Sequence, residues 1–135
     1  MSGKVLDSYG VIAFLENEPG ADKVAELIKS ARDKDRPLLL SVVNWGEVYY
    51  IVHRAAGKEA AARTMRTIDT LPIQVIEADR TLTQIAAEFK SSGKMSYADC
   101  FAAALAKARK AELITGDQEF KAVEDEIEIL WLPKK

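Results

Sequence analysis

The chain has 135 residues, of which 48% are hydrophobic and 30% are charged, and its net charge is −2. These values fit a single globular domain over residues 1–135 and argue against disorder. One cysteine, Cys100, rules out a disulfide framework and a thiolate zinc cluster, and one histidine, His53, rules out most histidine-rich metal sites. No apolar run is long enough to span a bilayer, and the N-terminus lacks a signal-peptide pattern, so we expect a cytoplasmic protein with no membrane partner.

Five short apolar runs, each ending in polar residues, predict buried β-strands. In chain order they are Val5–Asp7, Pro37–Ser41, Ile73–Ile76, Leu113–Thr115 and Ile127–Leu130. Apolar residues at helical spacing lie between these runs, for example at Val24, Leu27, Ile28 and Ala31. Strands that alternate with helices predict right-handed crossovers and a parallel sheet between two helical layers, which is an α/β fold of the three-layer α/β/α sandwich type.

Two helices, at about 79–90 and 96–110, lie between the third and fourth predicted strands, where a single crossover needs only one helix. The two helices therefore form a hairpin, and the second must return from the carboxyl edge of the sheet to its amino edge to lead into the fourth strand. Its first turn, which contains Asp99, is expected at the carboxyl edge of the sheet.

Three further acidic residues map to the same edge. Asp7 ends the first predicted strand, Glu47 lies in the first turn after the second, and Asp117 follows the fourth. Ligands of open α/β folds bind at the carboxyl ends of the strands, so we interpret these three acids and Asp99 as one cluster. Each acid also has a purely structural interpretation, as a helix cap at Asp7 or Asp117, or in capping boxes at Asn44–Glu47 and Ser96–Asp99.

Four clustered carboxylates repel one another, so such a cluster takes up protons or holds cations. Oxygen ligands without His or Cys favour the hard ions Mg²⁺ and Mn²⁺. Mg²⁺ completes its coordination with water and substrate phosphate, so the predicted chemistry is phosphodiester hydrolysis assisted by metal. Basic residues would then guide the substrate, unless they form solvated helix faces; the candidates are Lys29, Arg32, Lys34, Arg36, His53 and Arg54.

Four segments carry a family resemblance by their order and spacing. They are Val5–Ser8, with Glu18–Gly20 after an apolar helix; Ser41–Val48; Met95–Cys100; and Leu113–Phe120. Together they resemble the PIN-domain family, and within it the VapC toxins of bacterial and archaeal toxin–antitoxin pairs. The resemblance implies a five-stranded parallel sheet of strand order 3-2-1-4-5.

The resemblance also implies roles for individual residues. It assigns Asp7, Glu47, Asp99 and Asp117 to the catalytic, metal-binding acids of the family. The supporting positions beside them are Ser8, Asn44, Thr115 and Glu119. The metal implied is Mg²⁺ or Mn²⁺, and the substrate implied is structured RNA such as tRNA or ribosomal RNA.

Relatives of this kind form homodimers and are silenced by a small antitoxin of the VapB type that packs across the helices near the site. A groove for an antitoxin helix would need apolar surface. The aromatic residues available for such a groove, or else for the core, are Tyr9, Phe14, Trp45, Tyr49 and Tyr50.

Two alternatives keep the fold but change the function. In the first, the fold serves as a protein-interaction module with weak or absent nuclease activity; the complete set of four acids argues against it. In the second, the protein is a housekeeping RNA-processing nuclease without an antitoxin. The sequence by itself leaves the second alternative open.

Overall fold

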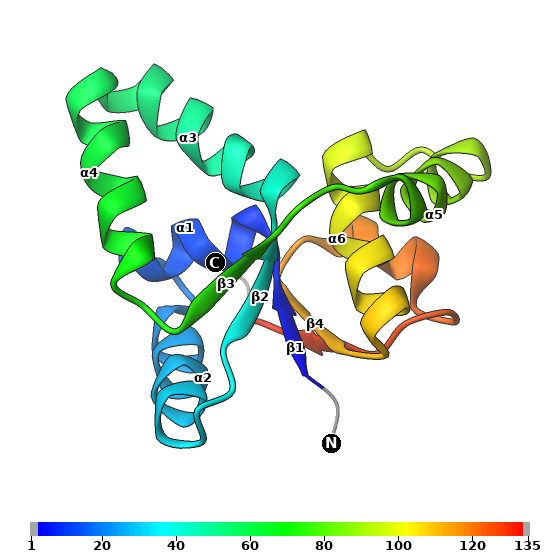
Figure 1. Cartoon of the computed structure of the whole chain (residues 1–135), viewed down its shortest axis with the longest axis horizontal. Helices are drawn as coiled ribbons and strands as arrows, with labels where there is room; N and C mark the ends of the chain where they lie inside the picture. The colour runs from blue at the N-terminus through cyan, green and yellow to red at the C-terminus, as the bar shows by residue number, and fades with distance from the viewer. Residues whose placement is uncertain (1–2, 134–135) are drawn as a thin grey trace.

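The structure of the chain is a computed structural model that describes residues 3–133. Its centre is a parallel sheet with the strand order β3-β2-β1-β4-β5 (Figure 1). The strands are β1 (Lys4–Leu6), β2 (Leu38–Ser41), β3 (Ile73–Ile76), β4 (Glu112–Thr115) and β5 (Ile129–Trp131). The predicted strand order and the parallel arrangement are confirmed.

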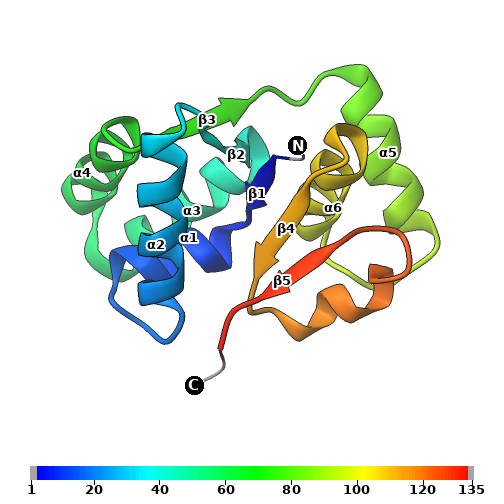
Figure 2. The same cartoon turned by 90° about the horizontal axis from the view of Figure 1, so that it is seen from below.

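Helices cover both faces of the sheet, which confirms the three-layer sandwich. Figure 2 shows α1 to α4 on one side of the sheet and α5 and α6 on the other. The helices are α1 (Ser8–Leu15), α2 (Ala21–Asp33), α3 (Val42–Ala56), α4 (Lys58–Asp69), α5 (Arg80–Ser91), α6 (Tyr97–Arg109) and the 3-10 helix η1 (Gln118–Val123). Within residues 3–133, none of the helices combines the length and the apolar character that crossing a membrane requires.

The central strands are buried on both faces, as their continuous apolar runs predict. Val5 of β1 and Leu113 of β4 belong to the core cluster under α5 and α6. Leu6 and Ile114, one residue further along each strand, belong to the cluster that includes residues of α1 to α4. Because side chains alternate along a strand, two cores hold the sheet from opposite sides, and the polar residues that follow the strands collect at its carboxyl edge.

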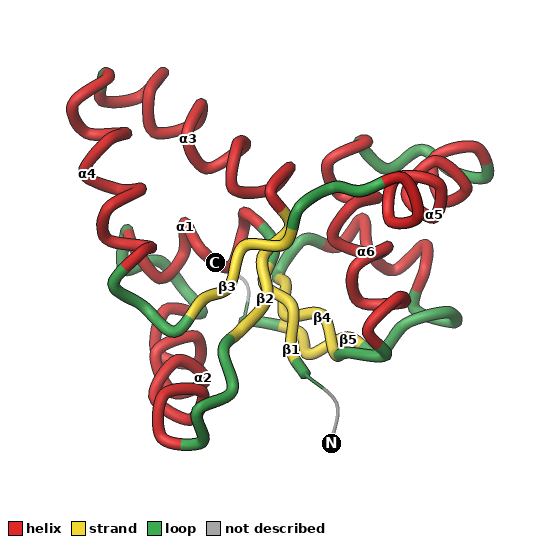
Figure 3. Tube along the Cα trace, in the orientation of Figure 1, coloured by secondary structure: helices red, strands yellow, loops and turns green. Residues whose placement is uncertain are grey.

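The helices α5 and α6 form the expected hairpin, which Figure 3 shows together with the return of the chain to β4. Ser96 is the N-cap of α6, and its Oγ accepts a hydrogen bond from Asp99 N at 3.1 Å. Since α6 runs back toward the amino end of β4, its first turn lies at the carboxyl edge of the sheet. This confirms the expected position of Asp99.

The last strand begins two residues later than predicted. Ile127 is apolar and fits the predicted strand, but its N–H bonds to Val123 O in the turn that follows η1. Ile127 is nevertheless buried, at 8% exposure. An apolar residue that a turn packs into the core has the same sequence pattern as the first residue of a buried strand, so the pattern alone misplaces the boundary.

Candidate functional site

Acidic side chains gather at the carboxyl edge, where α6 meets the segment after β4. Asp99, Asp117 and Glu119 can each place a carboxylate oxygen within 4.8 Å of the other two, and we call these three residues the carboxylate trio. Asp99 is buried, Asp117 is half-buried and Glu119 is exposed, so the trio opens to solvent. Asp99 and Asp117 meet as the topology predicts, and Glu119, which the sequence placed beside the site, joins them.

Asp7 follows β1 directly, and only 1% of it is exposed. Its Oδ1 accepts a hydrogen bond from Gly10 N at 2.8 Å, and its Oδ2 accepts one from Thr115 Oγ1 at 2.5 Å. Burial raises the pKa of Asp7 to about 7; the Thr115 hydrogen bond opposes this rise, and the charges of Asp99 and Asp117 add to it. Asp7 is therefore electrostatically coupled to the carboxylate trio, although it lies outside the 4.8 Å group.

Asp99 is 8% exposed and sits among several negative charges. The pKa of Asp99 is raised to about 7, mainly by burial and also by the charges of Asp117 and Glu47. The influence of Glu47 brings the fourth predicted acid into the same electrostatic environment. The four acids that were predicted to converge are thus coupled in the structure, with Asp99 at the centre of the coupling.

Asn44 connects α3 to α6 beside these acids. Its Nδ2 donates to Glu47 Oε1 at 3.0 Å and to Ala98 O at 3.1 Å. Asn44 is fully buried, and its Oδ1 has no hydrogen-bond partner among the described residues. The amide orientation follows from two acceptors, because only the NH₂ group can bond to both of them. Asn44 therefore fixes the Glu47 carboxylate relative to the residue just before Asp99.

The segment after β4 holds its acids through a short chain of hydrogen bonds. Asp117 N donates to Thr115 Oγ1 at 3.0 Å, and Glu119 N donates to Asp117 Oδ1 at 3.0 Å. Thr115 is fully buried and donates its own hydroxyl proton to Asp7. Thr115 thereby positions acidic residues from β1 and from β4 at once.

Three of these acids, Glu47, Asp99 and Asp117, line an open hollow of about 360 Å³. Its lining comprises Ser8, Tyr9, Ile12, Glu18, Glu47, Ile51, Ser96, Asp99 and Asp117. The predicted supporting residue Ser8 is therefore at the site. The sequence analysis missed Ile12 and Ile51; the signal for Ile51 was its spacing of four residues from Glu47, which puts both side chains on one face of α3.

The donor atoms of the site fit a hard divalent cation. The carboxylate trio offers oxygen only, and within residues 3–133 no His or Cys joins it. Asp7 and Asp99 both have a pKa of about 7 because the buried site disfavours several negative charges together. A bound cation would remove that cost. The residues present therefore suit Mg²⁺ or Mn²⁺ better than a thiophilic or imidazole-bound metal.

The structural interpretations of the acids prove partly right. Asp7 and Asp117 are the N-caps of α1 and η1, and Ser96 caps α6. The capping box at Asn44–Glu47 is wrong, because α3 begins at Val42 with Ser41 as its N-cap. Glu47 consequently lies in the second turn of α3, not the first. A capping role and a place in the site thus coexist in the same carboxylates.

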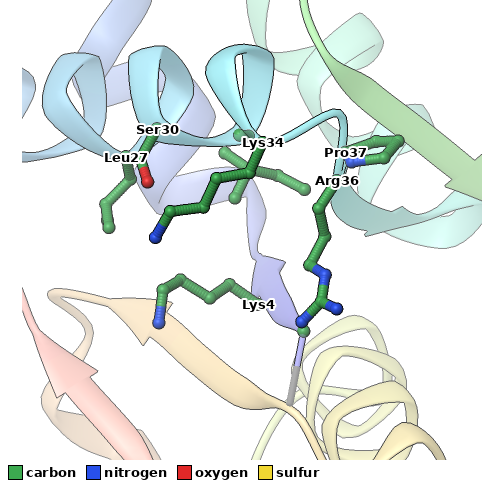
Figure 4. Close-up of a pocket in the computed structure, with 9 residues that line it drawn as sticks. Lys4, Leu27, Ser30, Lys34, Arg36 and Pro37 are labelled. Atoms are coloured by element: carbon green, nitrogen blue, oxygen red, sulfur yellow. The ribbon is translucent and has the colours of Figure 1, made fainter. Parts of the chain in front are cut away.

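Two of the basic residues considered as substrate guides lie elsewhere. Lys34 and Arg36 flank a hollow at the amino edge of the sheet together with Lys4 (Figure 4). Lys4 also forms a salt bridge with Glu112 at 2.8 Å. The amino edge is opposite to the acids, so Lys34 and Arg36 do not lie beside the carboxylate trio. A role in guiding the substrate stays a prediction for these two residues.

The aromatic residues divide between the core and the surface. Tyr9, Phe14, Trp45 and Tyr49 are half-buried against the core cluster beneath α1 to α4. Tyr50 is 45% exposed, with the guanidinium of Arg54 5.0 Å from the centre of its ring. Most of the set therefore contacts the core while keeping part of each ring at the surface. Cys100 is a buried free cysteine, and burial raises the pKa of its thiol.

Solved structures of similar fold include VapBC2 of Rickettsia felis bound to a DNA fragment from its promoter. That chain has a TM-score of 0.75 and 17% identity, with 96% of this chain and 98% of that one covered. The sarcin–ricin-loop-cleaving toxin VapC20 of Mycobacterium tuberculosis has a TM-score of 0.71 and 17% identity, with 90% and 95% covered. VapBC-1 of nontypeable Haemophilus influenzae has a TM-score of 0.71 and 18% identity, with 95% and 96% covered.

A comparison with curated protein sequences gives no significant match. The family model described as PIN domain matches residues 4–126, which include all four predicted acids and Glu119. The match covers most of the chain. The chain belongs to the PIN domain family.

Proposed function

We propose that this protein is an endoribonuclease that requires Mg²⁺ or Mn²⁺ and hydrolyses phosphodiester bonds in structured RNA such as tRNA or ribosomal RNA. The observation that carries the proposal is the carboxylate trio, Asp99, Asp117 and Glu119, at the edge where α/β folds bind ligands. A divalent cation held there would supply activation of water and stabilisation of the charge that develops on the phosphate.

Asp7, Glu47, Asp99 and Asp117 are the acids to which we assign cation binding and catalysis. Asp99 and Asp117 belong to the carboxylate trio and would hold the cation directly, whereas Asp7 and Glu47 are coupled to Asp99 through their charges. Because the pKa of Asp7 and of Asp99 is about 7, both carboxyl groups are partly protonated at neutral pH in the metal-free protein. Cation binding therefore releases protons.

Three polar residues would support these acids without touching the scissile bond. Thr115 orients Asp7 by donating to its Oδ2, and Asn44 orients Glu47 by donating to its Oε1. Ser8 lines the hollow next to Asp7. The exposed carboxylate of Glu119 completes the trio on the solvent side, where a substrate phosphate would arrive.

The test is cleavage of total cellular RNA by the purified protein with Mg²⁺, with Mn²⁺ and with EDTA. Asp7→Asn and Asp99→Asn serve as matched variants that keep side-chain volume. We expect discrete products that require metal and disappear in both variants, provided that circular dichroism shows both variants folded. Mapping the product ends names the target RNA and the cut site.

Equal cleavage by wild type and variants would assign the activity to a contaminant. Absence of cleavage by wild-type protein that binds Mn²⁺ normally would contradict the nuclease proposal and favour the protein-interaction alternative. A cut confined to precursor RNA would favour the housekeeping nuclease over a toxin.

We further propose that the protein is the toxin of a type II toxin–antitoxin pair, acts in the cytoplasm and forms a homodimer. The support is that similar structures include VapBC complexes and a toxin named for cleaving the sarcin–ricin loop. The proposed partner is a small VapB-type protein. The expected result is that the product of a short adjacent gene co-purifies with this chain and abolishes cleavage; failure to inhibit would contradict the pairing.

A further inference from the structure

The hollow beside the acids has an apolar side that the proposed hydrolysis does not use. Tyr9 and Ile12 of α1 and Ile51 of α3 line it together with Glu47, Asp99 and Asp117. We call Tyr9, Ile12 and Ile51 the apolar wall. The same open space is therefore lined by carboxylates, which suit a cation, and by an aromatic ring and two aliphatic side chains, which do not.

Gly116 fixes the place of Tyr9 in this wall. A Cβ at Gly116 would lie 2.4 Å from Tyr9 Cε1 and 2.7 Å from Tyr9 Cζ, so the tyrosine ring would have to move to make room for it. The ring thus rests against the backbone that leads into Asp117. Because Gly116 is buried and has no side chain, it provides the room that holds the tyrosine ring beside the carboxylate trio.

We propose that the apolar wall is a nucleobase subsite, in which a base next to the scissile phosphate leaves its stack and lies against Tyr9. The inference rests on the proposed function, since the acids and a bound cation would receive the phosphate of the same nucleotide. Aromatic side chains stack on any base, and aliphatic side chains exclude water from the other contacts. The volume of about 360 Å³ is at the lower end of that of small-molecule sites, which is enough for one nucleotide.

A subsite of this kind determines which RNA can be cut. A base reaches the wall only when it is unstacked, and extrusion from a duplex costs pairing and stacking energy that a single-stranded nucleotide does not lose. The substrate is therefore an unpaired segment, such as a hairpin loop within a structured RNA. Perfect duplex of the same sequence should be a poor substrate.

The decisive experiment combines a protein substitution with an abasic nucleotide. The RNA is a short single-stranded oligoribonucleotide that spans the mapped cut site, with an abasic residue at each flanking position in turn. For wild type we expect kcat/KM to fall about 5- to 150-fold at one flanking position, which corresponds to the stacking of one base. In the Tyr9→Ala variant, kcat/KM on intact RNA should fall by a similar factor. The abasic residue should lower kcat/KM of this variant little further. If the losses in kcat/KM from the substitution and from the abasic residue multiplied, the two changes would act independently and the proposal would be overturned.

Further variants separate stacking from folding. Tyr9→Phe keeps the ring and should keep the abasic penalty, whereas Tyr9→Leu keeps apolar volume and should lose it. Gly116→Ala should displace the ring and weaken cleavage, and the double variant Gly116→Ala/Tyr9→Ala should be no worse than Tyr9→Ala. Tyr50→Leu is the matched control, because Tyr50 is 45% exposed and does not line the hollow; it should leave the penalty unchanged. Mn²⁺ affinity and melting temperature are recorded for each variant.

A binding measurement decides the subsite even if the nuclease proposal fails. The probe is a single-stranded decamer with 2-aminopurine at its centre, mixed with Asp99→Asn protein, which is not expected to cleave it, or with wild type if wild type does not cleave. We expect the 2-aminopurine fluorescence to be quenched on binding. The same protein carrying Tyr9→Leu in addition should bind the decamer without quenching. Equal quenching in both proteins would contradict the subsite. If the Tyr9→Leu variant quenched normally but was no longer inhibited by a protein partner, the apolar wall would be a protein-docking surface instead.

Discussion

At the scale of single residues, Thr115 controls how readily Asp7 ionises. The Thr115 hydroxyl donates to Asp7 Oδ2 at 2.5 Å and opposes the effect of burial, so that the pKa of this carboxyl group is raised only to about 7. A hydrogen bond to a charged group contributes about 1.5–3 kcal/mol, which corresponds to a shift of about one to two pKa units. The hydroxyl therefore keeps Asp7 available to a cation near neutral pH.

Thr115→Val should move the pH dependence of cation binding upward. The variant removes the hydrogen bond and keeps the side-chain volume, so the pKa of Asp7 rises further and Mn²⁺ binds only at higher pH. Calorimetric titration with Mn²⁺ across pH 5–9 measures the shift, which we expect to be about one pH unit. Thr115→Ser is the control, because it keeps the hydroxyl. An unchanged profile in the valine variant would show that Thr115 has only a packing role.

At the scale of elements, the acids meet because two helices begin at the same edge of the sheet. These helices are α3 and α6. Asn44 of α3 links them through its bond to Ala98 O of α6, and it also bonds to Glu47 of α3. Asn44→Ala should leave Glu47 free to turn into solvent and should leave a cavity where the amide was. We expect a loss of about 1–3 kcal/mol in the free energy of unfolding, together with weaker Mn²⁺ binding. Denaturant unfolding and calorimetry measure the two effects.

Gly46 offers a matched control for that experiment. It lies in the same turn of α3, and a Cβ built there meets no atom within 4 Å. Glycine inside a helix destabilises it by about 0.5–1 kcal/mol relative to alanine. Gly46→Ala should therefore raise the free energy of unfolding by roughly that amount and leave Mn²⁺ affinity unchanged. A fall in affinity would show that any change in α3 disturbs the site, and would weaken the assignment of Asn44.

The elements differ in how far the sequence predicts them. Strand order and the edge that carries the acids follow from the alternation of buried runs with helices, and from the hairpin that must return α6 to β4. The start of α3 was misplaced because Ser41 both ends β2 and caps the helix, so no polar residue separates the two elements. The bond from Asn44 to Ala98 O joins residues 54 positions apart, and only the packed fold brings them together.

The position of Glu119 in the site also depends on the packed fold and not on a sequence pattern. Its nearness to Asp99 and Asp117 depends on the turn in which Glu119 N bonds to Asp117 Oδ1, and a propensity pattern does not specify that turn. The apolar wall was hidden for a related reason. Its three side chains come from two helices that meet only in the fold, and Tyr9 alone was noted, as an aromatic residue for a groove or for the core.

At the scale of the whole molecule, the site opposes the stability of the fold in the absence of metal. Asp7 and Asp99 have a pKa of about 7 in the folded chain, against about 3.9 for an unfolded aspartate. Between these pH values the folded chain holds protons that the unfolded chain has released. The free energy of unfolding therefore decreases as pH rises from about 4 to about 7, and this contribution is constant above pH 7.

The melting temperature of the metal-free protein should accordingly fall between pH 5 and pH 7.5, and saturating Mn²⁺ should remove most of that fall. A cation that binds only the folded, deprotonated site stabilises it according to its concentration and affinity, and it competes with protons at lower pH. The Mn²⁺-induced rise in melting temperature should therefore be larger at pH 7.5 than at pH 5. The double variant Asp7→Asn/Asp99→Asn isolates these two groups from the other carboxylates, and scanning calorimetry should show for it a flatter pH dependence and little response to Mn²⁺. If the variant kept the wild-type pH dependence, other titrating groups would be responsible for it. The cost of ionising Asp7 and Asp99 in the folded chain would then not be the effect that a cation relieves.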